Sequence, residues 1–99
     1  GGAALPYVVG RLRRNFTVSH DKLGDPDAAL AALYYDTIVQ DTRSLRFLAD
    51  VVGADRIMMG SDMPFPIGDL APLGIVTDTP FTDAERAAIN GGLAARLFT

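Results

Sequence analysis

The sequence predicts an α/β fold in which two short parallel strands alternate with helices. Residues 33–37 and 56–60 have the aromatic or apolar composition of strands, and helical patterns precede and follow them. Strands that alternate with helices favour a parallel sheet. Because two parallel strands cannot cover both faces of a sheet, we expect the missing strands to come from chain outside these 99 residues. The length suits part or all of one domain.

A helix is predicted to begin near Leu5. Its apolar residues recur at helical spacing, and Pro6 is tolerated in its first turn. The arginines at 11, 13 and 14 are then expected near its C-terminal end, where positive charge complements the helix dipole. Residues 15–27 are predicted to be a loop, and residues 28–32 a short helical turn.

A second helix is predicted between the two strands. Asp41 or Thr42 is its expected N-cap, Gly53 its expected stop, and its apolar face comprises Leu45, Leu48 and Val52. Residues 56–60 form an apolar run without alternation, which is typical of a strand buried on both faces.

The rest of the chain is predicted to be irregular and then helical. Residues 61–80 are rich in proline and glycine, so we expect a long loop. The pattern from Thr82 to Glu85 is a capping box that opens a third helix. Residues 90–92 should break this helix, and residues 93–98 should form a last short one.

Composition excludes several classes of function. A formal net charge of −3 argues against nucleic acid or an anionic membrane as the main partner, and no apolar run approaches the length of a membrane span. Without cysteine there is no disulfide and no thiolate metal site, which suits the reducing cytoplasm, the expected location. Nucleotide-binding glycine motifs and a serine nucleophile elbow are also missing.

Asp62 is the strongest candidate for a chemical group. It comes two residues after the second predicted strand, and functional groups of parallel α/β folds lie just past the carboxyl ends of strands. Gly60 and Ser61 allow a sharp turn, and Pro64 and Pro66 stiffen the chain on the other side of Asp62. A carboxylate held there can bind a metal or accept a proton. The alternative is an ordinary turn cap.

Other polar residues have simpler interpretations. His20, the sole histidine, lies in a polar stretch and is interpreted as a solvated loop residue. Asp36 ends the first strand, where we expect a structural hydrogen bond to a neighbouring loop. The three arginines of the first helix are interpreted as a solvated helix end.

The segment around Asp62 resembles a known family. Gly-Ser-Asp-x-Pro-Phe-Pro at residues 60–66 comes soon after Gly-Ala-Asp-Arg at residues 53–56. Together with residues 33–37, 45–48 and 82–98, these motifs are similar to the C-terminal part of the amidohydrolase-related metal-dependent decarboxylases. Two departures from the family pattern are Met63, where tyrosine is common, and Leu93, where asparagine is usual.

The resemblance implies a fold and a site. Residues 1–99 would be the C-terminal part of a single distorted (β/α)₈ TIM barrel, comprising its last two β/α units and closing helices. Asp62 would be catalytic, either a ligand of one divalent metal, zinc in expectation, or a hydrogen-bond partner of its water. Phe65 would line the substrate pocket. The histidine ligands, and a catalytic histidine directly before Gly1, would lie outside this chain.

The implied activity is decarboxylation of a small unsaturated or aromatic carboxylic acid by the intact parent. Two alternatives stay open: metal-dependent hydrolysis of a C–N or lactone bond, and a truncated, non-catalytic interaction module that pairs through its strand edges. A homo-oligomeric parent is also open. We expect the 99 residues alone to be inactive, to aggregate, and to bind no stoichiometric zinc.

Overall fold

A computed structural model describes residues 1–99. Its helices and strands, in chain order, are α1 (Leu5–Val18), α2 (Pro26–Ala32), β1 (Tyr35–Asp36), α3 (Thr42–Val52), η1 (Ala54–Arg56), β2 (Ile57–Met58), α4 (Pro72–Asp78), α5 (Asp83–Ala87), η2 (Ala88–Gly92) and α6 (Leu93–Phe98). Of these, η1 is a 3₁₀ turn and η2 is a π-helix.

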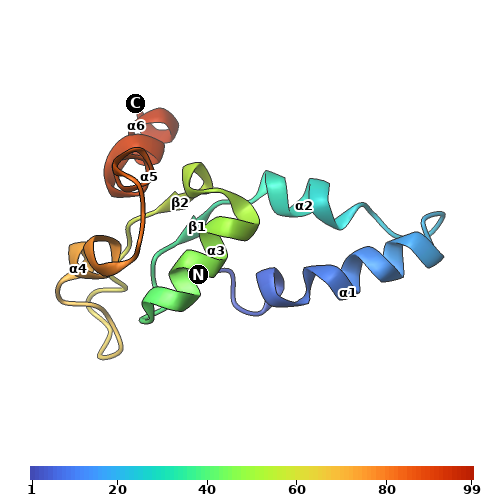
Figure 1. The fold of residues 1–99 in the computed structure, drawn as a ribbon, viewed down its shortest axis with the longest axis horizontal. Helices are drawn as coiled ribbons and strands as arrows, with labels where there is room; N and C mark the ends of the chain where they lie inside the picture. The colour runs from blue at the N-terminus through green and yellow to red at the C-terminus, as the bar shows by residue number, and fades with distance from the viewer.

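The two strands pair in parallel, as predicted, although each is shorter than the sequence suggested. Tyr35 lies opposite Ile57, and Asp36 lies opposite Met58. Side chains alternate across a strand, so the first pair and the second pair face opposite sides of the sheet. Tyr35 and Ile57 are buried in the core with residues of α3, α4 and η2 (Figure 1).

The opposite face of the sheet is open. Asp36 is exposed and Met58 is half-buried. Within these 99 residues the second strand is buried on one face only, and burial of its other face by chain outside them stays a prediction. An apolar run such as Met58-Met59 looks the same in the sequence whether or not a neighbouring element covers it.

Helix α3 begins and ends where the sequence predicted. Asp41 caps it, because its carboxylate accepts a hydrogen bond from the Ser44 N–H at 2.8 Å. Gly53 ends it in the left-handed region, at φ 91°, which glycine adopts without steric cost. Leu45 and Leu48 are buried against the sheet, so α3 covers one face of the strand pair.

The structure corrects two predictions for the C-terminal third. Residues 61–80 are not wholly irregular, because α4 lies within them with Val76 fully buried in the core. The predicted break at residues 90–92 is also wrong, because η2 joins α5 to α6 without leaving the helical region. Burial of Ile89 and Leu93 outweighs the intrinsic cost of two glycines, which is about 1 kcal/mol each.

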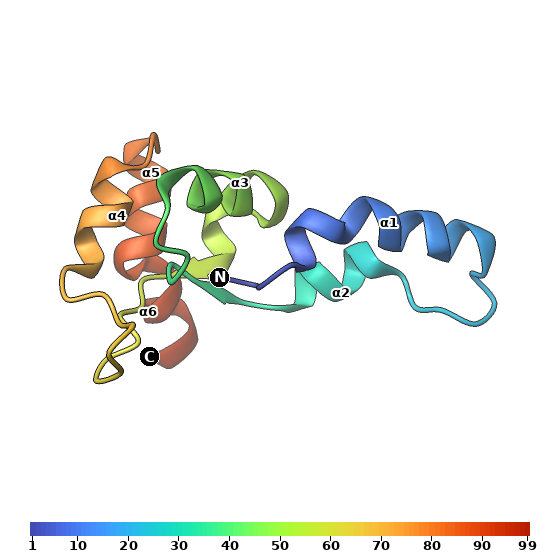
Figure 2. The same cartoon turned by 90° about the horizontal axis from the view of Figure 1, so that it is seen from below.

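Helices α1 and α2 lie side by side and extend away from the other elements as an arm, residues 5–32 (Figures 1 and 2). Helix α1 runs to Val18, beyond the predicted start of the loop, so its arginines lie away from its last turn. Arg13 donates to the Asp27 carboxylate at 2.7 Å and joins the two helices. The arginines are exposed, as predicted, but the predicted place at the C-terminal end of the helix is wrong for all three.

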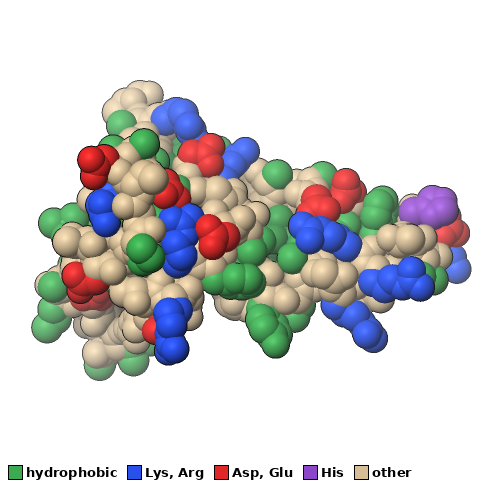
Figure 3. All heavy atoms as spheres, viewed as in Figure 1, with side chains coloured by type: hydrophobic (Ala, Val, Ile, Leu, Met, Phe, Trp, Pro, Cys, Tyr) green, Lys and Arg blue, Asp and Glu red, His purple; other side chains and the backbone are tan.

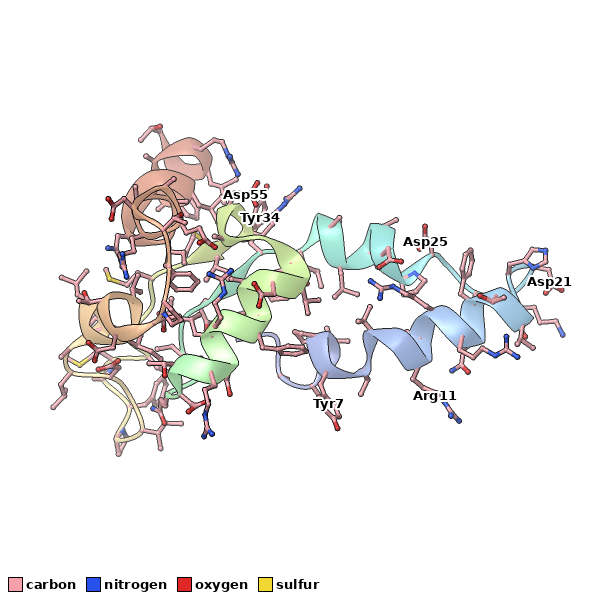
Figure 4. The ribbon with its side chains drawn as sticks, in the orientation of Figure 1. Tyr7, Arg11, Asp21, Asp25, Tyr34 and Asp55 are labelled. Atoms are coloured by element: carbon pink, nitrogen blue, oxygen red, sulfur yellow. The ribbon has the colours of Figure 1, made fainter.

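Other residues of the arm face solvent. Figure 4 shows Tyr7 and Arg11 projecting from α1 on the side away from α2. The molecule measures 45 × 29 × 26 Å, and its radius of gyration is 14.7 Å, against about 13 Å for a compact domain of this length. Two strands do not close a barrel. None of the helices has both the length and the apolar character needed to cross a membrane.

Candidate functional site

The carboxyl ends of the two strands are fastened together by Thr37. Its side chain is buried, its Oγ1 accepts from the Gly60 N–H at 3.1 Å, and its own N–H donates to the Met58 carbonyl at 3.1 Å. These bonds fix where the chain leaves β2. Asp62, two residues beyond Gly60, therefore lies just past the carboxyl end of the sheet, as the sequence predicted.

The Asp62 carboxylate makes no hydrogen bond and no ion pair within the chain, and it is exposed to solvent. Its backbone adopts the left-handed region at φ 56°. Aspartate is one of the few residues that visits this region readily. The result is a turn that presents a carboxylate with both oxygens available to a ligand.

Asp62 lies in a compact segment, the Asp62 loop, residues 61–69. The ends of the loop are joined by a hydrogen bond from the Asp69 N–H to the Ser61 carbonyl, at 2.7 Å. Inside it, the Phe65 N–H donates to the Asp62 carbonyl at 3.1 Å, and the Gly68 N–H donates to the Phe65 carbonyl at 2.8 Å. The turn that carries Asp62 is therefore held by the loop's own backbone.

Gly68 fits the loop because it lacks a side chain. A Cβ there would lie 2.8 Å from the Ser61 carbonyl oxygen and 3.0 Å from those of Asp62 and Phe65. The first distance is shorter than real Cβ contacts and the other two are tighter than most, so any side chain here would push the three carbonyls apart.

Phe65 lies on the Asp62 loop but is 63% exposed. Other exposed apolar side chains flank it, namely Met63, Ile67 and Leu70. Figure 3 shows apolar side chains gathered at the end of the molecule that carries this loop and α4. The structure thus brings Asp62 and Phe65 into one turn, and the predicted contact of Phe65 with a substrate stays a prediction.

A hollow of about 420 Å³ lies beside the loop, between the start of α3 and α4. Its lining includes Gln40, Asp41, Asp69, Leu70 and Asp78. Neither Asp62 nor Phe65 belongs to it. The hollow therefore adjoins the Asp62 loop at Gly68 and Asp69, but neither predicted site residue lines it.

Asp36 makes the structural contact that the sequence predicted. Its carboxylate accepts from the Ile38 N–H at 2.9 Å and from the Gly1 amino group at 2.5 Å. Gly60 packs against the same side chain, since a Cβ on it would lie 3.4 Å from that of Asp36. Gly1 and Gly60 are thereby brought to the same end of the sheet.

His20 is far from this site. It is exposed, as predicted, in the turn between α1 and α2. Figure 2 shows that turn at the opposite end of the molecule from the Asp62 loop. His20 therefore cannot serve as a ligand beside Asp62.

An ion pair joins α3 to α5. Arg46 Nη2 lies 2.8 Å from a Glu85 carboxylate oxygen, and its guanidinium stacks on the Phe81 ring at 4.7 Å. The Arg46 guanidinium, with the Thr82 N–H, lowers the pKa of Glu85 to about 2. Sequence reasoning found the capping box but missed this ion pair, because the partners are 39 residues apart.

The chain's donor set does not make a complete metal site. A catalytic zinc takes about three protein ligands and keeps one open position. Nowhere in the structure do three histidine, cysteine, aspartate or glutamate side chains gather at one point. Asp62 could supply one ligand, and a complete site would need further ligands from outside these 99 residues.

Comparison with known proteins agrees with the resemblance read from the motifs. A family model described as amidohydrolase matches residues 3–99. A protein of Dictyostelium discoideum named 2-amino-3-carboxymuconate-6-semialdehyde decarboxylase is 27% identical over 100 residues, which cover 95% of this chain and 28% of that protein. A protein of the same name from Caenorhabditis elegans is 32% identical over 92 residues, covering 87% of this chain and 23% of that protein.

The chain thus spans about a quarter of the length of these curated relatives. The family match covers nearly all of its residues, including both strands, the Asp62 loop and the closing helices. The chain belongs to the amidohydrolase family.

Proposed function

We propose that this chain is the C-terminal part of a metal-dependent decarboxylase and that Asp62 belongs to its active site. One observation carries the proposal: a free, exposed carboxylate lies just past the carboxyl end of a parallel strand, in a loop that its own backbone holds closed. Catalytic groups of parallel α/β barrels lie at this end of the strands. A structural turn cap would have its carboxylate paired, and this one is not.

The proposed parent is a (β/α)₈ barrel that contributes the missing strands. Both strands have one unpaired edge, and the face that bears Asp36 and Met58 is open. Parallel sheets are normally covered on both faces. Neighbouring strands would bury Met58 and Met59 and place the Asp62 loop at the mouth of the barrel.

In the proposed site Asp62 is one ligand of a divalent metal, zinc in our expectation, or the acceptor of a proton from its water. When bound, the metal would supply Lewis-acid polarisation and an activated water. Phe65, on the same turn, would present an apolar ring to the substrate. An aromatic wall beside a charged group suits a small unsaturated or aromatic carboxylic acid.

Decarboxylation is proposed ahead of hydrolysis because both relatives described above are named decarboxylases. The test uses the full product of the reading frame that contains this chain. Its metal content is measured, and release of labelled CO₂ from carboxyl-labelled unsaturated and aromatic acids is monitored before and after chelation.

The proposal predicts about one metal per chain and CO₂ release that stops on chelation and returns with zinc. Bound metal with hydrolysis of amide or lactone substrates, and without CO₂ release, would support a hydrolase instead. A product with neither metal nor turnover would contradict the enzyme proposal and favour an interaction module.

A further inference from the structure

Gln40 reaches across the carboxyl end of the sheet to the Asp62 loop. It comes four residues after β1, and its side-chain Nε2 donates to the Ile67 carbonyl at 2.5 Å. Its own backbone is left-handed, at φ 53°. Glutamine, unlike glycine, asparagine or aspartate, rarely adopts this conformation unless the surrounding structure imposes it.

This is the only hydrogen bond that joins residues 61–68 to another segment of the chain. The other hydrogen bonds of these residues lie within the Asp62 loop. No ion pair reaches the loop. Between its two ends, the loop is therefore joined to the rest of the chain by a single hydrogen bond.

The hydrogen bond at Ile67 is coupled to Asp62 through the packing of the loop. Ile67 precedes Gly68, around which the carbonyls of Ser61, Asp62 and Phe65 gather. Because Gly68 leaves no free space among those carbonyls, a displacement of Ile67 displaces the Asp62 peptide as well.

The residues on both sides of Gln40 are held in place by hydrogen bonds. Behind it, the Val39 N–H donates to the Thr37 carbonyl at 2.8 Å, and Thr37 is fastened to the exit of β2. Ahead of it, Asp41 caps α3. Both neighbours of Gln40 are thus tied to the sheet or to the helix that covers it.

We propose that Gln40 is a positioning residue for Asp62. Its amide clamps the Ile67 carbonyl, which fixes the loop and thereby the direction of the Asp62 carboxylate. The consequence for metal binding rests on the proposed function, whereas the clamp itself does not. Nothing in the local sequence points to this contact, because its partners are 27 residues apart.

The test compares three variants in the full product of the reading frame. Gln40→Glu keeps the size of the side chain but removes the N–H donor. Gln40→Lys changes the chemistry but restores an N–H donor. Arg43→Gln is the matched control, because the Arg43 side chain is 93% exposed and makes one ion pair, with Asp41 at 3.5 Å, and no bond to the loop.

Amide hydrogen exchange at Phe65 and Gly68 reports on the loop directly, since both N–H groups donate inside it. Loss of one hydrogen bond should speed exchange about fivefold in Gln40→Glu. Gln40→Lys and Arg43→Gln should exchange like the unmodified protein. Unchanged exchange in Gln40→Glu would overturn the clamp.

Zinc affinity and turnover report on Asp62. Gln40→Glu should weaken zinc binding about fivefold and lower kcat more than it raises KM, with rescue by Gln40→Lys. Faster exchange with unchanged zinc affinity would overturn the positioning role. If the unmodified protein holds no metal, the proposed function fails, and the exchange result still decides whether Gln40 clamps the loop.

Discussion

At the scale of single residues, the site was predictable only in part. The place of Asp62 was predictable because its position after an apolar run is a local signal, and the structure puts it past β2 with a free carboxylate, while its catalytic role stays a prediction. Gln40 was missed because its partner, Ile67, is distant in sequence. Glu85 showed its capping role in the sequence, but not its ion pair with Arg46.

Gly68 should be the least replaceable residue of the Asp62 loop. We expect Gly68→Ala to cost about 1–3 kcal/mol locally, because its Cβ would press on three carbonyl oxygens. Hydrogen exchange at the Asp69 N–H should then rise. Gly74→Ala is the matched control, since a Cβ at Gly74 meets nothing within 4 Å. Equal exchange in both variants would contradict the close packing around Gly68.

Glu85 should make the free energy of unfolding depend on pH. Its pKa is about 2 in the folded chain and near the ordinary 4.5 when unfolded. Between pH 4.5 and about pH 2, the Glu85 carboxyl is therefore protonated in the unfolded chain but still ionised in the folded chain. Because of this difference, the free energy of unfolding falls as the pH is lowered through this range. Solvent screening limits the loss to about 1 kcal/mol.

Urea unfolding at pH 6 and at pH 3 measures this effect. Glu85→Gln keeps the capping oxygen but loses the charge, so its unfolding free energy should fall less between the two pH values than that of the unmodified protein. Asp83→Asn, in the same helix, removes a carboxylate that is fully exposed and should leave the fall unchanged. Identical falls in all three proteins would refute the account.

At the scale of elements, the sequence predicted the helices whose ends and apolar faces depend on neighbouring residues. Helix α3 has its cap, apolar face and glycine stop within a dozen residues, and all three were confirmed. Helix α4 was missed because proline and glycine dominate its surroundings, while its place depends on burial of Val76 against distant residues. The continuous run from α5 to α6 was missed for the same reason.

The π-helix η2 offers a test of that explanation. A Cβ at Gly91 meets nothing within 4 Å, whereas one at Gly92 would lie 3.1 Å from the Ala87 carbonyl oxygen. Gly91→Ala should therefore raise the free energy of unfolding by about 0.5–1 kcal/mol, and Gly92→Ala should gain nothing. Urea unfolding of both variants measures the difference. A loss of stability in Gly91→Ala would contradict a helical backbone at η2.

At the scale of the whole molecule, the 99 residues leave much surface uncovered. Their accessible area is 6,339 Å², against about 5,400 Å² for a compact protein of this mass. Only 15 of the 99 residues are buried. The parallel pairing of the strands was predictable from the alternation of elements, but the protruding arm was not, because nothing local opposes packing of α1 against the sheet.

We therefore expect the 99 residues, purified alone, to aggregate. Both strands have an unpaired edge, and large apolar side chains such as Leu70 and Phe65 are exposed. Light scattering and zinc analysis of the isolated chain should show oligomers and no stoichiometric metal. A monomer that melts cooperatively and carries one zinc would contradict this expectation.

In our proposal, the Asp62 carboxylate helps to hold the parent's metal, either as a ligand or through the metal's water. Zinc affinity of the full reading-frame product tests it most directly, with Asp62→Asn compared against Asp69→Asn. Asp69 ends the same loop, and its carboxylate only caps the Ala71 N–H, which asparagine can also do. We expect Asp62→Asn to weaken zinc binding at least about tenfold and Asp69→Asn to leave it unchanged. Equal zinc affinity in the two variants would contradict the claim.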